Sequence, residues 1–252
     1  PSDLKKDFLS PIGYGALMGI LKNYEVINPF ISSSIDSLNR LKPGFEAPVC
    51  IVCSLGNSIE TPSRNRTVLV GLVRDMSNPM STRLEVRSPN PLTNTYIALS
   101  VIYQSMLDGI TAVVKAGKTA KELEAEISKL PESEGFYLEK GRAYRSEEDV
   151  FEHFTLEERN RIFGIHPATV YENLSNLKKY TDKVEVLLKG GVIDETLINS
   201  FITAFTNRWV TEILNRLLPE NMDIVRKCKA VHDILNAQDL DITHWAQVDK
   251  LR

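Results

Sequence analysis

The chain has 252 residues, of which 42% are hydrophobic and 25% charged, a composition that is typical of soluble globular proteins and excludes disorder throughout. Its 30 basic and 33 acidic residues give a net charge of −3, which does not favour nucleic-acid binding. Three cysteines are too few for a disulfide scaffold and indicate a reducing, cytoplasmic compartment, and because no apolar run reaches the roughly 18 residues that span a bilayer, we expect no membrane partner.

The first ninety residues predict two helices followed by three strands. The helices cover residues 8–23, whose glycines favour close packing against a neighbour, and residues 28–41. The strands cover residues 48–54, 67–73 and 82–87, and the first two are nearly continuous apolar runs, as in buried strands. We expect an α+β fold in which these strands form part of an antiparallel sheet backed by helices.

Helical patterns dominate the rest of the chain. Residues 96–115 predict a well-buried helix, and the capping-box pairs Thr119–Glu122 and Thr155–Glu158 predict two further helix starts. Other helix candidates are residues 168–180, 194–218 and 222–235. The sheet is therefore followed by a mainly helical C-terminal region.

The strand over residues 82–87 carries the strongest chemical signal. Its alternation puts Arg83, Glu85 and Arg87 on one face. If that face were buried, the charges would have to be paired or hold a ligand. Arginines grip carboxylate or phosphate oxygens, and a carboxylate can hold Mg²⁺. The alternative, which the spacing by itself favours, is a solvated face with cross-strand ion pairs.

Two loop segments carry further candidates. Glu46 lies on a loop rich in proline and glycine, where a carboxylate can act as a lid residue or general base. Arg64 and Arg66 lie at the start of a strand and could bind phosphate. In both segments the local sequence by itself favours ordinary solvated side chains.

The cysteines and histidines do not predict a metal or redox centre. Cys50 and Cys53 lie three apart in a strand, which sends their side chains to opposite faces, so we expect buried, inert thiols. The four histidines all lie in the helical half and lack metal-ligand spacing.

Three ordered stretches resemble the C-terminal part of the catalytic domain of the glutamine synthetase family. They are residues 39–49 (NRLKPGFEAPV), residues 65–67 (NRT), and residues 83–99 (RLEVRSPNPLTNTYIAL), which run on to LDGI at 107–110. A fainter likeness returns at residues 191–218. Residues 120–168 match nothing in the short bacterial form, which favours a larger bacterial-type variant.

The resemblance implies a reaction and a role for each matched residue. The family joins ammonia to glutamate with ATP and Mg²⁺ or Mn²⁺, through a γ-glutamyl phosphate, in homo-oligomeric rings. The resemblance implies that Arg40 binds glutamate, that the flap residue Glu46 removes a proton from ammonium, and that Arg66 contacts the transferring phosphoryl group and the γ-carboxylate. It also implies that Arg83 contacts ATP phosphates, that Glu85 binds metal and that Arg87 binds substrate carboxylate. These roles fit the chemistry, because phosphoryl transfer needs cations where negative charge is spread.

Departures from the family limit what the resemblance predicts. Thr67 stands where the family usually has Ser, and Gly71 where a second arginine is usual. The segments that give the family's other metal-binding glutamates have no counterpart, and one carboxylate, Glu85, cannot form a Mg²⁺ cage. We therefore expect a single C-terminal fragment that is inactive alone, with an active-site half at residues 1–115 and a helical region at 116–252.

Several interpretations stay open. The first is part of a glutamate–ammonia ligase, and a close variant is a γ-glutamyl ligase that uses another amine. The second is a noncatalytic relative kept as a structural or interaction protein, which the set of matched charged residues argues against. The third is a helical interaction module, which would explain residues 116–252 but not the first hundred.

Overall fold

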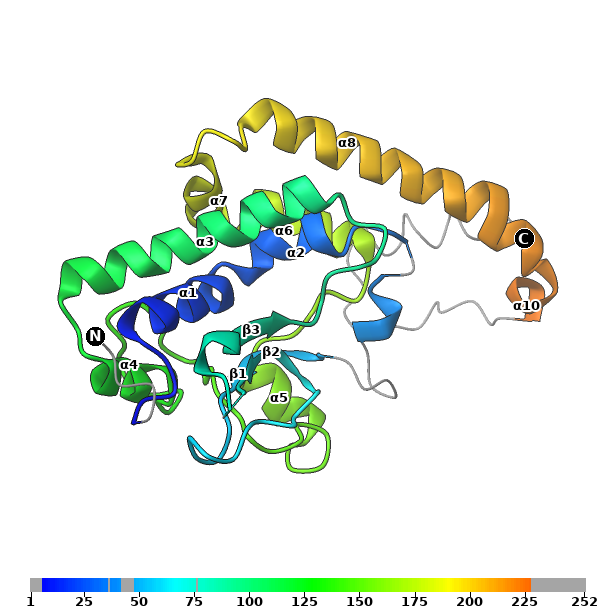
Figure 1. Cartoon of the computed structure of the whole chain (residues 1–252). Coiled ribbons are helices and arrows are strands. Elements are labelled where there is room, and N and C mark those ends of the chain that lie inside the picture. The colour runs from blue at the N-terminus through cyan, green and yellow to red at the C-terminus, as the bar shows by residue number, and fades with distance from the viewer. Residues whose placement is uncertain (1–5, 36, 42–47, 76, 228–252) are drawn as a thin grey trace. The chain divides into compact units, whose positions relative to one another are not determined.

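The computed structural model describes residues 6–35, 37–41, 48–75 and 77–227 (Figure 1). The chain divides into two compact units, residues 1–206 and 207–252. Helices and a small mixed sheet make up the first unit, so the predicted α+β class is confirmed.

Two helices open the first unit. Helix α1 (Pro11–Lys22) confirms the first predicted helix, and the Ser10 hydroxyl caps it by accepting from the N–H of Gly13 at 3.1 Å. Helix α2 (Tyr24–Ile31) starts earlier than predicted for residues 28–41. In the described part of the second half of that range, the structure has the 3₁₀ turn η1 (Asn39–Leu41) instead of a continued helix. The apolar side chains of α2 are buried, so tertiary packing offsets the hydrogen bond lost at its internal proline.

Helix α3 (Thr95–Ala116) packs closely along α1 (Figure 1). A Cβ on Gly19 would overlap the carbonyl oxygen of Ser105, and a Cβ on Gly109 would overlap that of Gly15. The prediction that glycines of the first helix allow close packing is therefore confirmed.

The outer face of α3 is exposed, although a well-buried helix was predicted. Its exposed apolar residues are Tyr96, Leu99, Tyr103, Leu107 and Val114. By length and composition alone α3 could cross a membrane, and 28% of the apolar stretch is buried. The expectation that no apolar segment reaches this length is thus corrected. Asp108 interrupts the run of apolar residues without lowering the mean hydropathy of the helix enough to exclude it.

The three predicted strands form one sheet in the order β1–β2–β3. They are β1 (Cys50–Ser54), β2 (Val68–Val73) and β3 (Arg83–Val86). Strands β2 and β3 pair antiparallel, with Gly71 opposite Glu85, but β1 and β2 pair parallel, which corrects the antiparallel prediction for that pair. Residues 55–67 are long enough to return the chain to the start of β1, as parallel pairing requires.

Both cysteines of β1 are buried and free, as predicted. Burial raises the pKa of Cys50 to about 12 and raises the pKa of Cys53 still further. Cys50 packs in an apolar cluster with Val52, Val68 and Phe163. The thiolate forms are therefore suppressed, and neither thiol has the character of a reactive cysteine.

The outer edge of β1 is covered by the helical half of the chain. The N–H of Cys53 donates to the carbonyl of Tyr144 at 2.9 Å, and the N–H of Ser146 donates to the carbonyl of Cys53 at 2.9 Å. The N–H of Ile51 donates to the carbonyl of Gly164 at 3.1 Å. Part of the segment that the sequence left unassigned thus extends the sheet.

The remaining helices largely follow the predictions. Both predicted capping boxes are present, at the starts of α4 (Ala120–Ile127) and α5 (Leu156–Ile162). Helix α6 (Val170–Lys179) was also predicted, whereas α7 (Thr181–Leu188) was not. The chain continues through α8 (Glu195–Glu212), a π-helical turn η3 (Ile213–Leu217), α9 (Leu218–Glu220) and α10 (Met222–Lys227). The rest of the predicted helix 222–235 lies outside the described residues.

Four charged side chains form a group that we call the core ion cluster: Glu25, Glu139, Arg142 and Lys183. Lys183 is buried, Glu25 and Arg142 are mostly buried, and Glu139 is half-buried, with 35% of its side chain exposed. Arg142 Nη1 lies 2.8 Å from Glu25 Oε1, and Lys183 Nζ lies 2.9 Å from Glu25 Oε2 and 2.8 Å from Glu139 Oε1. Burial acts to raise the pKa of Glu139, but Lys183 and Arg142 hold it below its usual value. The cluster joins α2, α7 and the chain after α4, with two charges of each sign.

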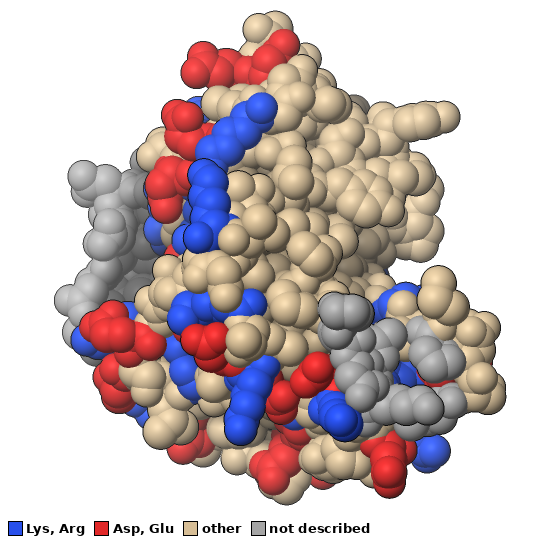
Figure 2. All heavy atoms as spheres, turned by 60° about the vertical axis from the view of Figure 1, so that its left-hand side comes forward, with Lys and Arg blue, Asp and Glu red and all other residues tan. Residues whose placement is uncertain are grey.

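Surface charges are mixed on the face shown in Figure 2. Basic and acidic side chains lie interspersed there and do not gather into a patch of one sign.

Candidate active site

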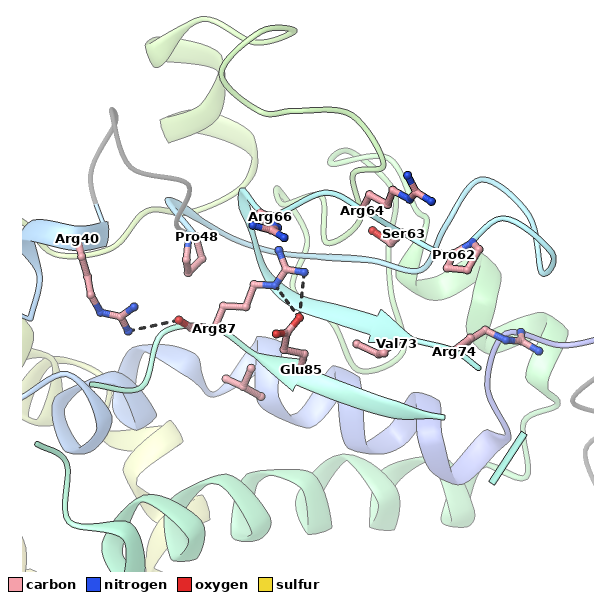
Figure 3. Close-up of a pocket in the computed structure, with 11 residues that line it drawn as sticks. Arg40, Pro48, Pro62, Ser63, Arg64, Arg66, Val73, Arg74, Glu85 and Arg87 are labelled. Atoms are coloured by element: carbon pink, nitrogen blue, oxygen red, sulfur yellow. Dashed lines mark hydrogen bonds and ion pairs between the residues drawn. The ribbon is translucent and has the colours of Figure 1, made fainter. Parts of the chain in front are cut away.

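A cavity of about 830 Å³ lies beside the ends of β2 and β3 (Figure 3). It is lined by Arg40, Pro48, Pro62, Ser63, Arg64, Arg66, Val73, Arg74, Glu85, Val86 and Arg87. Five of these residues are arginines and one is a carboxylate, and we call this the arginine cavity. Fixed cations in such excess attract anionic groups, and guanidinium groups match the oxygens of carboxylates and phosphates.

The charged face of β3 points to solvent and to this cavity rather than to the core. Arg83 and Glu85 are exposed, whereas Leu84 and Val86 are half-buried. Glu85 and Arg87 line the arginine cavity, but Arg83 is not among its lining residues and donates to the carbonyl of Ser81 at 3.2 Å. The structure thus brings together two of the three predicted charges.

Arg87 is held on two sides. Its Nε and Nη2 lie 3.2 and 3.0 Å from Glu85 Oε2, and its Nη1 donates to the carbonyl of Asn65 at 2.7 Å. The guanidinium lies against Gly71, where an added Cβ would be 3.0 Å from Nη2. The missing side chain at position 71 therefore leaves room for Arg87.

Arg40 lines the cavity and also holds the chain that leaves β3. Its Nη2 donates to the carbonyl oxygens of Ser88 at 2.5 Å, Pro89 at 2.7 Å and Arg87 at 3.3 Å. Figure 3 shows this side chain reaching toward Arg87 from the far side of Pro48. Arg40 therefore fixes the backbone next to Arg87.

A neutral pair of rings lies in the core near Arg40. The Tyr24 hydroxyl lies 3.0 Å from His166 Nδ1 and donates to Asn28 Oδ1 at 2.9 Å. Burial lowers the pKa of His166 to about 3, and the charge of Arg40 acts in the same direction. His166 is therefore neutral at physiological pH.

The loop before β2 brings Arg64 and Arg66 to the arginine cavity, and both side chains are exposed. The same two arginines line a neighbouring cavity of about 500 Å³, together with Asn65, Thr67, Glu147 and Asp149. The two carboxylates come from the chain after α4, which no local sequence signal connects with this loop.

Arg74 is a lining residue to which the sequence assigned no role. It follows β2 directly, and its Nη1 donates to the carbonyl of Asp7 at 3.2 Å. The sequence feature that could have pointed to Arg74 is its position directly after the predicted strand 67–73, the end of which lines the cavity. Glu46, predicted as the flap carboxylate, lies outside the described residues.

The described residues do not fit a complete divalent-metal site. Among them no group of three or more His, Cys, Asp or Glu side chains could hold a metal ion. Glu85 is the one carboxylate among the described lining residues, and it is paired with Arg87. Because Mg²⁺ requires near-octahedral oxygen coordination, this set fits the anionic groups of a substrate rather than the ion itself.

The chain is similar in sequence to known glutamine synthetases. The family model described as the glutamine synthetase catalytic domain matches residues 2–141. A glutamine synthetase of Bradyrhizobium diazoefficiens is 30% identical over 202 residues, which are 80% of this chain and 33% of that protein. Those of Pseudomonas aeruginosa and Aquifex aeolicus are 33% and 32% identical over 53% and 50% of this chain, and over 29% and 24% of their own lengths. The chain thus spans about a third or less of these relatives.

Proposed function

Because this chain belongs to the glutamine synthetase catalytic-domain family, we propose that it supplies the anion-binding side of an ATP-dependent glutamate–ammonia ligase site. The observation that carries the proposal is the arginine cavity, where five arginines face one carboxylate within the family-matched residues. Glutamate, ATP and an acyl phosphate all present carboxylate or phosphate oxygens, which guanidinium groups bind in bidentate fashion.

The arginines differ in the work that their geometry suits. Arg87 is held by Glu85 and Asn65, so it is positioned before a ligand arrives and suits a substrate carboxylate. Arg66 lies at the exposed rim, where it can meet the transferring phosphoryl group. Arg40 has its Nη2 committed to backbone carbonyls, so its binding of glutamate rests on Nη1.

Two assigned roles rest on the resemblance. Glu46 takes a proton from ammonium in this proposal, which makes ammonia nucleophilic. Arg83 contacts ATP phosphates that extend past the arginine cavity along β3. Residues 1–115 form the active-site half, and residues 116–252 a mainly helical region.

The proposal treats the 252-residue chain as binding-competent but inactive alone. The family uses ATP with Mg²⁺ or Mn²⁺, and Glu85 by itself offers too few oxygen ligands for such an ion. A cytoplasmic homo-oligomeric ring is the assembly that we propose for the active protein, with glutamate, ammonium and ATP as its substrates.

Binding to the chain itself tests the first step. Pyrophosphate titrated calorimetrically into the 252-residue chain is expected to bind, and Arg66→Gln or Arg87→Gln to weaken binding by about tenfold, the loss of one charge-assisted contact. Arg161→Gln on α5 removes the same charge from an exposed site outside the cavity and is expected to leave binding unchanged. Absence of binding, or an equal loss in all three variants, would refute the proposal.

Turnover tests the reaction. With the protein expressed from its natural gene, ADP release from ATP and glutamate should depend on ammonium and collapse in Glu46→Ala. A panel of small amines separates the ammonia ligase from a γ-glutamyl ligase for another amine. A folded, nucleotide-binding protein that turns over none of them would be a noncatalytic relative.

A further inference from the structure

The loop that carries Arg66 is fastened to residues 143–150, which we call the strap. The strap lies outside the residues that match the family's catalytic-domain model, which end at 141. It runs along the edge of β1, where the N–H of Ser146 donates to the carbonyl of Cys53. It therefore joins the arginine-bearing loop from a part of the chain far away in sequence.

Asn65 makes the first connection. Its Nδ2 donates to the carbonyl of Glu148 at 2.6 Å and lies 3.5 Å from that of Ser146. Its Oδ1 accepts from the N–H of Thr67 at 2.9 Å and from the Thr67 hydroxyl at 2.7 Å. One side chain thus spans Arg66 and binds the strap at the same time.

Thr67 makes the second connection. Its hydroxyl oxygen accepts from the N–H of Val150 at 3.2 Å, and both residues are buried. Val150 is fully buried in the apolar cluster below β1 and β2, so this end of the strap is anchored in the core. The residues on both sides of Arg66 are therefore tied to the strap.

The middle of the strap is held by Glu147 and Arg145. The Glu147 carboxylate accepts from the N–H groups of Leu55 at 3.0 Å and Gly56 at 2.8 Å, and pairs with Arg145 Nε at 2.6 Å. Burial acts to raise the pKa of Glu147, but these donors and the Ser54 hydroxyl keep it below its usual value. These hydrogen bonds and ion pairs fix the strap to the loop that follows β1.

From these contacts we infer that the strap is a positioning element that sets Arg66 and Arg87 for anion binding, with Asn65 and Thr67 as its links. Arg87 is included because its Nη1 donates to the carbonyl of Asn65, the residue that the strap holds. Loss of a link lets the loop move, and both guanidinium groups lose their common geometry. The inference rests on the proposed function only in taking an anion as the ligand.

The test compares Thr67→Val with Thr67→Ser in the full 252-residue chain. Valine has a similar shape but removes the acceptor for Val150, whereas serine keeps the hydroxyl. Pyrophosphate affinity is measured by calorimetry, the Nε–Hε NMR signals of Arg66 and Arg87 report side-chain placement, and thermal melts verify folding. We expect Thr67→Val to bind at least fivefold more weakly with shifted arginine signals, and Thr67→Ser to restore both.

Contrary outcomes are distinct. If Thr67→Val binds like the unmodified chain, if its arginine signals do not move, or if Thr67→Ser loses as much affinity, the inference is wrong. If the unmodified chain does not bind pyrophosphate, the proposed function fails, and the arginine signals of the two variants decide the inference alone. If Thr67→Val does not fold, Asn65→Ala replaces it. Its pyrophosphate affinity and arginine signals are then compared with those of the unmodified chain, and the substitution is at a half-buried position.

Discussion

The arginine cavity and the core ion cluster are both built from arginine and carboxylate side chains, but their charge balance differs. Among the residues that the structure describes, the cavity is lined by five arginines and one carboxylate at a solvent-accessible surface. The core ion cluster has two charges of each sign, and the Lys183 side chain is only 4% exposed. Balanced charges satisfy one another, whereas an excess of one sign is stabilised by a ligand. If the proposed function holds, charge balance distinguishes structural from binding groups in this chain.

Breaking the core ion cluster is expected to give the largest effect. Lys183→Met leaves the mostly buried Glu25 and the half-buried Glu139 with a single cation. Breaking a buried pair typically costs about 3–5 kcal/mol of unfolding free energy, and the partial exposure of Glu139 places the expected loss toward the lower end of that range. Lys189→Met removes an exposed partner of Asp108 and should cost less than about 1 kcal/mol. Urea unfolding measures both. Equal small losses would show that the core ion cluster contributes little to stability.

Lowering the pH tests how a buried neutral group, the imidazole of His166, affects stability. Folding lowers the pKa of His166 from 6.5 to about 3, so between these values the unfolded state binds a proton that the folded state excludes. Stability is therefore expected to fall as the pH drops from 6.5 to 5, with a slope approaching about 1.4 kcal/mol per pH unit.

The control for this window is His166→Gln, which cannot titrate. The carboxylates whose pKa is lowered on folding lose their contribution below about pH 4.5, so they add little above pH 5. Urea unfolding at several pH values should give a flatter profile for the variant. Identical slopes in the two proteins would contradict the neutral buried state of His166.

Salt sharpens the contrast between exposed and buried charge. Raising NaCl from 0.05 to 0.5 M shortens the Debye length several-fold and should weaken pyrophosphate binding at the arginine cavity by roughly fivefold. The destabilisation caused by Lys183→Met should change by less than about 0.5 kcal/mol, because buried pairs are screened little. Calorimetry and urea unfolding give the two numbers. A strongly salt-dependent loss of stability in Lys183→Met would mean that the Lys183–Glu25 pair is screened like an exposed one.

The smallest effect is expected at Gly71. The atoms nearest to a Cβ there belong to the far end of the Arg87 side chain, which is flexible, so Gly71→Ala should change the unfolding free energy by less than about 1 kcal/mol. Pyrophosphate affinity should fall by about threefold because the guanidinium is displaced. Thermal melts and calorimetry measure the two quantities. A large loss of stability with unchanged affinity would mean that Gly71 serves the sheet instead.

Local patterns predicted most of the elements. The three strands, the capping boxes of α4 and α5, and the close approach of α1 at its glycines follow from residues near one another in the sequence. Helix α2 was misplaced because Asn28-Pro29 suggests a helix start, whereas burial of the preceding apolar residues extends the helix to Tyr24. The exposed face of α3 was missed because an apolar pattern does not reveal whether anything covers it.

The candidate site was predictable only where its residues belong to short recognisable motifs. Arg66, Glu85 and Arg87 were proposed from short stretches and do line one cavity. The strap was not foreseen, because its hydrogen bonds to Asn65 use backbone carbonyls of residues 146 and 148, and any sequence carries such carbonyls. The pairing of Glu25 with Lys183 joins residues that are 158 positions apart, and no local sequence pattern predicts such a contact.

The buried thiols of β1 can be used to measure local unfolding of the sheet. Cys50 and Cys53 can meet an alkylating reagent only when the edge strand separates from residues 144–146 and 164 or from the apolar cluster beneath it. Their labelling rate therefore measures how often this part of the molecule unfolds under native conditions. A change in the labelling rate on addition of pyrophosphate would show that a ligand at the arginine cavity alters the local unfolding of β1. The measurement needs no probe introduced into the chain.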